Sequence, residues 1–197
     1  MHWNGTSWLL VNGPPVPGGE LSGLKAFASN DVWAVGTKNY FGNNPTTLTL
    51  HWDGTSWTEV PSPNADDGSY LSGIDGTAPN SVWAVGESTV GTSIQHTLAM
   101  HWDGTAWSIA PTPLINSDES FYGVRTFSDT NVCAVGMSSF APLSERWDGT
   151  QWSVIPTPAV DPGSILFAIT GREGAAWAAG YQNYFDELDE LFLQVTP

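Results

Sequence analysis

Basic side chains are scarce in this chain. Its 197 residues include five Lys and Arg against 20 Asp and Glu, so the formal net charge is −15 at pH 7. Proteins that bind nucleic acids or anionic membrane surfaces depend on Lys and Arg to neutralise phosphates. The composition therefore argues against both kinds of partner. A neutral ligand, a cation or a positively charged protein surface suits this charge better.

Cysteine is also scarce, and long apolar runs are missing. Cys133 is the only cysteine, so an intramolecular disulfide cannot form. It stands where Trp33 and Trp83 stand in other repeats, and we interpret it as a small buried hydrophobic residue rather than a catalytic thiol. No run is long enough to cross a membrane, and no signal peptide is visible. We expect no membrane insertion.

Sustained helical periodicity is missing as well. The chain contains 21 Gly and 14 Pro, residues that disfavour helix interiors and suit turns between short strands. Apolar residues make up 41% of the chain, enough for a sizeable core. These features predict a single all-β domain.

A motif with two tryptophans occurs four times at a spacing of about 50 residues. A second motif, typified by Val32-Trp33-Ala34-Val35-Gly36, keeps the same spacing. Each full unit holds four short β-prone runs, an Asp-Gly hairpin signal before the last run, and closing prolines. Four antiparallel strands per repeat predict a β-propeller. The copies of the tryptophan motif begin at His2, His51, His101 and Arg146.

The repeats place a single propeller domain over 1–197, with blades at about 19–63, 70–113, 120–158 and 164–197. The last blade lacks a fourth strand, which residues 6–11 can supply, so about 1–13 would join it. Such strand exchange would close a ring of four blades and remove exposed strand edges. Two alternatives stay open. Residues 191–197 could complete the last blade, or the chain could be part of a longer propeller.

The pairing of Asn80-Ser81-Val82-Trp83-Ala84-Val85-Gly86 with the tryptophan motif resembles a repeat of bacterial, often secreted, β-propeller proteins. These are related to tectonin-like and kelch-like propellers. The Asp-Gly-Thr hairpin is similar to the Asp-box of sialidase-type propellers, although the serine that opens that box is absent. The resemblance covers nearly the whole chain. It implies a propeller located outside the cell or on the surface of a bacterium, and it does not single out one activity.

The motif residues themselves favour structural roles. The tryptophans flank a two-residue turn and are expected to pack between blades, although a tryptophan row could also stack on sugars. The equivalent histidines lie far from the ring axis, so the copies cannot converge on one metal, and we expect them to pack on neighbouring Trp. A ring of inner-strand residues has alternating charge and predicts ion pairs near the centre. Its members are Lys25, Asp75, Arg125 and Thr170.

Most acidic residues fall in the loops after the second and fourth strands of each blade. These loops emerge on one side of a propeller, which we call the long-loop face, and they also carry aromatic residues. Long variable loops are where repeat proteins place recognition. A solvated surface that only keeps the protein soluble is the alternative interpretation. The acids are Glu20, Asp66, Asp67, Glu87, Asp118, Glu119, Glu145, Asp161, Asp186, Glu187, Asp189 and Glu190.

The function predicted from this face is a non-catalytic, lectin-like module that binds carbohydrate through aromatic and acidic loops. A protein-interaction or structural domain of a larger secreted protein is the alternative. A glycosidase-type enzyme, which needs two suitably spaced carboxylates, is the third possibility. No cofactor is expected, but carboxylates could hold Ca²⁺. The predicted ligand-binding residues are Tyr40, Phe41, Asp66, Asp67, Asp118, Glu119, Tyr184 and Phe185.

Overall fold

The computed structural model describes residues 1–91, 94–158, 160, 162–184 and 187–195, and every regular element within them is a β-strand. An N-terminal hairpin, β1 (His2–Trp3) and β2 (Trp8–Leu9), precedes four antiparallel sheets. Sheet 1 contains β3 (Glu20–Ala28), β4 (Asp31–Lys38), β5 (Thr46–Trp52) and β6 (Trp57–Glu59). Sheet 2 contains β7 (Gly68–Ala78), β8 (Ser81–Val90), β9 (Ile94–Trp102) and β10 (Trp107–Ile109). Sheet 3 contains β11 (Glu119–Ser128), β12 (Asn131–Ser138), β13 (Ala141–Trp147) and β14 (Trp152–Val154). Sheet 4 contains β15 (Ile165–Arg172), β16 (Ala175–Tyr184) and β17 (Glu187–Val195).

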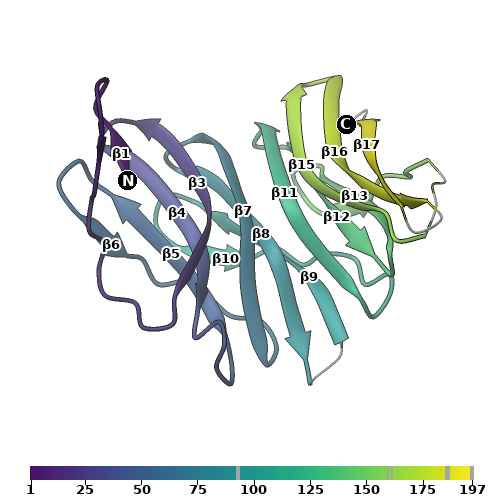
Figure 1. Ribbon diagram of the computed structural model, residues 1–197, viewed down its shortest axis with the longest axis horizontal. Coiled ribbons are helices and arrows are strands. Elements are labelled where there is room, and N and C mark those ends of the chain that lie inside the picture. The colour runs from purple at the N-terminus through teal and green to yellow at the C-terminus, as the bar shows by residue number, and fades with distance from the viewer. Residues whose placement is uncertain (92–93, 159, 161, 185–186, 196–197) are drawn as a thin grey trace.

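The four sheets follow one another around an arc, as the blades of a propeller do (Figure 1). The first strand of each sheet contacts the first strand of the next, so β3, β7, β11 and β15 line the inner side. Within each sheet the strands pair in chain order. The all-β class and the blade-like units predicted from the sequence are therefore confirmed.

The predicted strand exchange is absent from the described residues. Strands β1 and β2 pair with each other, and sheet 4 has three strands. The alternative, in which 191–197 forms a fourth strand, also fails, because β17 pairs with β16 along its whole length as the third strand. Sheets 1 and 4 lie at opposite ends of the arc in Figure 1. Closure of a four-bladed ring is not part of this structure.

The core repeats with the sheets. In each of the three junctions, two side chains from the second strand of one sheet pack into an apolar cluster on the next sheet. Trp33 and Val35 of sheet 1 pack with Leu71, Leu98 and Trp107 of sheet 2. Trp83 and Val85 pack in the same way on sheet 3. Cys133 and Val135 pack on sheet 4, and burial raises the pKa of the Cys133 thiol to about 12. The prediction that Cys133 is a small buried hydrophobic residue is confirmed. The packing between blades predicted for the motif tryptophans is confirmed for Trp107 and Trp152, whereas Trp3 and Trp8 are exposed.

Two of the repeated histidines, His51 and His101, have the predicted role, whereas His2 is exposed. The ring centroids of Trp33 and His51 lie 4.7 Å apart, and those of Trp83 and His101 lie 4.6 Å apart. Nε2 of His51 is also 2.9 Å from Oδ1 of Asp31. These imidazoles fill space beside the core tryptophans.

Inner-strand charges form the predicted ion pairs. Nζ of Lys25 lies 2.5 Å from Oδ1 of Asp75, and Nη1 of Arg125 lies 3.2 Å from Oδ2. The backbone N–H of Thr126 donates to Oδ2 of Asp75 at 2.8 Å. One carboxylate of sheet 2 thus joins the inner strands of sheets 1 and 3.

The Asp-Gly hairpin differs from the expected two-residue turn. Trp52 pairs directly with Trp57, which leaves a four-residue loop. Oδ1 of Asp53 accepts the backbone N–H groups of Thr55 and Ser56, both at 2.8 Å. Together with the Thr55 hydroxyl, which also donates to Oδ1, these N–H groups hold the pKa of Asp53 down to about 2. Gly54 has φ +97°, a left-handed conformation that favours glycine.

Two segments expected to be loops are largely strand. The loop predicted after the second strand of sheet 2 is short, because β8 extends to Val90 and β9 begins at Ile94. Residues 181–190 likewise belong mostly to β16 and β17. Several side chains near the β8–β9 tip are only partly buried. Polar side chains can therefore occupy both faces of the strands there, and no apolar alternation marks them.

Candidate functional site

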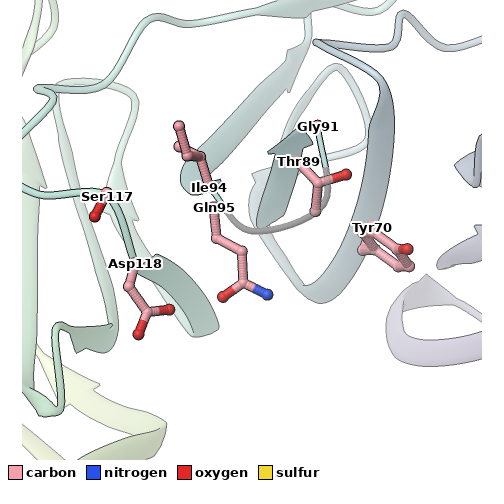
Figure 2. A pocket seen from close by; sticks show the side chains of 7 residues that line it. All are labelled: Tyr70, Thr89, Gly91, Ile94, Gln95, Ser117 and Asp118. Carbon is pink, nitrogen blue, oxygen red and sulfur yellow. The ribbon is translucent and has the colours of Figure 1, made fainter.

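A pocket of about 410 Å³ opens between sheets 2 and 3 on the long-loop face. Its lining comes from the start of β7, the tips of β8 and β9, and the segment that leads into β11. The side chains of Gln95 and Asp118 extend next to each other, with Tyr70 across from them (Figure 2). The lining residues are Tyr70, Thr89, Gly91, Ile94, Gln95, Ser117 and Asp118.

Backbone hydrogen bonds position the pocket between the two sheets. The N–H of Gln95 donates to the carbonyl of Ser117 at 3.0 Å, and Gln95 forms a parallel bridge with Asp118. The carbonyl of Asp118 accepts the N–H of Ser139 at 2.7 Å. This places the Asp118 carboxylate on a braced segment, because its own backbone and that of Ser117 are bonded to neighbouring strands.

Glu87 supplies negative charge behind the pocket. Nε2 of the pocket residue Gln95 lies 3.4 Å from Oε1 of Glu87, and the Ser120 hydroxyl donates to Oε2. Burial raises the pKa of Glu87, and the nearby Asp118 raises it further, while the Ser120 hydrogen bond lowers it. The pKa of Tyr70 is raised by burial and by Glu87. The pocket therefore has a negative electrostatic character that would favour a cationic group.

Exposed aromatic rings adjoin the pocket. Tyr40 and Tyr70 have ring centroids 5.7 Å apart, in an edge-to-face arrangement. Phe41 packs edge-to-face on Tyr40 at 5.0 Å and has 94% of its surface exposed. Tyr40 lies just after β4, so these rings bring sheet 1 to the edge of a pocket built by sheets 2 and 3. The structure thus groups the predicted Tyr40 and Phe41 with Asp118.

The predicted pair Asp66 and Asp67 lies beside the same pocket. Oδ2 of Asp67 accepts the N–H of the lining residue Gly91 at 2.8 Å. Oδ2 of Asp66 accepts the Ser88 hydroxyl at 2.7 Å and lies 3.6 Å from Nδ1 of His96. Both carboxylates brace the tip of the β8–β9 hairpin, which forms one wall of the pocket.

Two of the acids assigned to the long-loop face are buried instead. Glu119 is fully buried, and its Oε1 accepts the N–H groups of Ile115 and Asn116 at 3.1 and 2.7 Å. It therefore shapes the segment before β11 and cannot reach a ligand on the surface. Glu145 is fully buried within sheet 3. Both predictions fail because Glu119 opens β11 and Glu145 lies within β13, and spacing alone does not show which face of a strand an acid occupies.

The remaining predicted residues come from the end of sheet 4. Tyr184 is the last residue of β16, and its backbone pairs with Glu187. Phe185 lies outside the described residues. Sheet 4 is separated from the pocket by sheet 3, so the backbone position of Tyr184 does not join it to Tyr40 and Asp118.

Sequence reasoning missed several residues that form the pocket, above all Tyr70 and Gln95. Both are at the ends of strands, adjoining segments that were expected to be loops. A tyrosine at the start of an inner strand, beside acidic residues, is the signal that could have found the first. Gln95 could be found only by knowing how long the β8–β9 hairpin is, and the sequence pattern does not show that length.

Among the described residues, no group of three or more His, Cys, Asp and Glu side chains is arranged to hold a metal ion. The same part of the chain contains no helix long and apolar enough to cross a membrane.

No family model matches this chain, and no curated protein matches it. Solved structures do match, and one of them is described as "YCF48 bound to D1 peptide". That match has a TM-score of 0.56 and 14% sequence identity, and it covers 91% of this chain and 56% of that one. The chain thus spans little more than half the length of this solved neighbour. At this level of identity the likeness concerns the fold alone, and it agrees with the arc of sheets: the chain has a propeller-like fold.

Proposed function

We propose that this chain is a non-catalytic recognition propeller that binds a basic protein segment in the pocket between sheets 2 and 3. The observation that carries the proposal is the position of Asp118 and Glu87 in and behind a pocket whose rim carries exposed aromatic rings. Lys or Arg of a partner would pair with the carboxylates, while its apolar neighbours would pack on Tyr40 and Tyr70.

Charge supports a basic partner. The chain carries −15 overall, and none of the pocket-lining residues is basic. A negative surface steers positive partners and raises their association rate, an effect that salt screens. The peptide in the solved neighbour belongs to that protein, but it is consistent with recognition of a protein segment by this fold.

Carbohydrate is the second candidate, because one observation specifically favours it. Phe41 is almost fully exposed and packs on Tyr40, at the edge of a pocket that holds a carboxylate. Exposed rings beside hydrogen-bond acceptors suit sugar faces and hydroxyls. If carbohydrate is the ligand, Ca²⁺ held by loop carboxylates would be part of the proposal to test.

A peptide array tests the proposal and separates the two candidates. Immobilised 15-residue peptides that vary in charge and aromatic content are probed with the purified chain, and a glycan array is probed in parallel with and without Ca²⁺. We expect binding to Lys- and Arg-rich peptides, at least tenfold weaker for Asp118→Asn and for Tyr70→Ala. We also expect binding to weaken as the pH falls through the raised pKa of Glu87, because protonation removes a negative charge from the site.

Asp103→Asn is the matched control. Asp103 sits in an Asp-Gly hairpin at the opposite end of sheet 2, and Asn4 makes the same hairpin hydrogen bonds in the first copy of the motif. This variant removes one negative charge without touching the pocket, so binding should persist. If Asp118→Asn and Asp103→Asn lose peptide binding equally, net charge alone would account for the effect. Glycan binding with no peptide binding would replace the proposal with the second candidate.

A further inference from the structure

The two ends of the arc carry complementary halves of the junction that repeats inside it. At each internal junction, a residue of the second strand is buried by the next sheet: Trp33 is 3% exposed, Trp83 2% and Cys133 0%. Trp177 has the same place in sheet 4, because it pairs with Thr170 as Trp33 pairs with Lys25. Trp177 is 52% exposed, and Phe192 on the adjacent strand is exposed too. Sheet 4 therefore presents the inserting half of a junction.

Sheet 1 presents the receiving half. Leu71, Phe121 and Leu166 are equivalent residues of the inner strands in sheets 2 to 4, and all three are buried by the preceding sheet. Leu21 is their counterpart in sheet 1, since each of these residues pairs with the glycine of the second-strand motif, and it is 53% exposed. Leu24 of the same strand is exposed as well.

The tryptophan hairpins specify how the two halves would fit. Trp33 packs between Trp102 and Trp107 of the next sheet, with ring centroids at 5.0 and 5.4 Å. Trp83 packs in the same way between Trp147 and Trp152, at 5.1 and 5.3 Å. These distances recur with nearly the same interplanar angles, so the contact is a repeated structural unit.

The hairpin of sheet 1 has the same geometry but lacks the inserted ring. Trp52 and Trp57 have centroids 5.8 Å apart at an interplanar angle of 46°, against 5.9 Å and 46° for Trp102 and Trp107. Both Trp52 and Trp57 are only partly buried. Ala34, Leu48 and Leu50 form the apolar cluster behind them, and Val16 and Trp57 pack against it. This cluster corresponds to the one that receives Trp33 in sheet 2.

We propose that sheet 4 of this chain docks on sheet 1 of a second copy, with Trp177 inserted between Trp52 and Trp57 of that copy. Continuity with the three internal junctions favours a second copy as the partner, because its sheet 1 offers the same kind of receiving surface that sheets 2, 3 and 4 provide within the chain. The contact is head to tail, so two copies would form two such junctions if they close into a ring. Together they would supply eight sheets, within the usual range of propellers.

Charge sets the expected salt dependence. Each copy carries −15, so association works against electrostatic repulsion. Salt shortens the screening distance to about 8 Å at physiological ionic strength and to about 3 Å at 1 M. An apolar junction between two acidic copies should therefore tighten as salt rises, whereas an ionic interface would weaken.

Light scattering after size exclusion tests the proposal on the 197-residue chain. We expect a mass twice the 21.1 kDa of one chain at micromolar concentrations. The dissociation constant should be at least tenfold higher for Leu21→Glu and for Trp177→Glu. Leu114→Glu is the matched control, since Leu114 is an exposed leucine of a loop away from both end faces, and its mass should equal that of the wild type. Circular dichroism verifies that each variant is folded.

Mixing the two variants tests the head-to-tail arrangement. Trp177→Glu keeps an intact sheet 1, and Leu21→Glu keeps an intact sheet 4, so an equimolar mixture should form a complex of twice the chain mass through one good junction. A wild-type chain that stays monomeric at all concentrations and salts would overturn the proposal. So would two variants that fail to associate when mixed, because a head-to-tail arrangement leaves one intact junction in the mixture. Larger species with the same sensitivity to the variants would keep the junction and exclude the two-copy ring.

Discussion

Glu145 occupies a core position that holds an aliphatic residue in the other sheets. It pairs with Ala134, as Leu50, Met100 and Leu193 pair with the alanines of their own sheets. Neither of its carboxylate oxygens has a hydrogen-bond partner among the described residues. Burial, and then the charge of Glu119, raise the pKa of Glu145 from 4.5 to about 8. A charged carboxylate here is costly, because nothing compensates for its lost hydration.

Replacing this residue should stabilise the protein. The pKa of Glu145 is higher in the folded state than in the unfolded state. The free energy of unfolding is therefore greatest below the unfolded pKa and falls as the pH rises toward the folded pKa of about 8. We expect Glu145→Leu to increase the free energy of unfolding by roughly 2 to 4 kcal/mol at pH 8 and by less at pH 5. Urea denaturation at both pH values measures it. Met100→Glu is the converse control, and it should destabilise more at pH 8. A gain that does not depend on pH would show that the pKa of Glu145 is not raised in the folded state.

At the scale of the elements, Asp75 on β7 links three neighbouring sheets of the arc. Its side chain is 8% exposed and accepts from Lys25 on β3 and from Arg125 and Thr126 on β11. Nε of Arg125 also donates to the carbonyl of Gly171 at 3.3 Å, which extends the network to sheet 4. Removing the Asp75 carboxylate would leave the two cations, Lys25 and Arg125, and the Thr126 N–H group without their shared acceptor.

We therefore expect Asp75→Ala to lower the free energy of unfolding by about 2 to 3 kcal/mol, since a poorly exposed acceptor with several donors is lost. Chemical denaturation measures the change. Glu59→Ala, which breaks the more exposed pair with Lys38, is the matched control and should cost about 1 kcal/mol or less. Similar losses in the two variants would mean that the inner network adds no more than a surface ion pair.

At the scale of the whole molecule, the arc has two kinds of sheet. Within the part of the chain that the structure describes, sheets 2 and 3 have a neighbour on each side, while sheets 1 and 4 have one neighbour each. In repeat architectures, stability comes from the units and from the contacts between neighbouring units. The end sheets of a single chain therefore gain less from their neighbours than the middle sheets do.

Hydrogen exchange should reveal this gradient. In the Leu21→Glu variant, kept monomeric, we expect amides of β4 and β16 to exchange at least tenfold faster than those of β8 and β12, because end sheets can open without separating two junctions. Mass spectrometry of peptic fragments resolves these strands. In the wild-type chain at high concentration, protection of β4 and β16 should rise toward that of the middle strands. Uniform protection in the monomer would contradict the model of additive junctions.

The repeating unit and several roles of its motif residues can be predicted from the sequence pattern alone. Trp33, Trp83 and Cys133 recur at one position of the repeat, and this equivalence predicts a small buried hydrophobic role for Cys133, which its full burial confirms. The alternating charges of Lys25, Asp75 and Arg125 predicted the inner ion pairs in the same way. Local periodicity suffices in these cases, because each residue acts through contacts that recur with the repeat.

The packing of the sheets, and not the sequence pattern, sets which acids face solvent, where the pocket lies and how the arc ends. Asp118 and Glu119 are adjacent in sequence, yet one lines the pocket and the other is buried. Trp177 matches Trp33 in its motif but is exposed, because no sheet follows it in the described arc. The repeat pattern specifies what each sheet can bury, whereas burial itself depends on whether a neighbouring sheet is present to cover it.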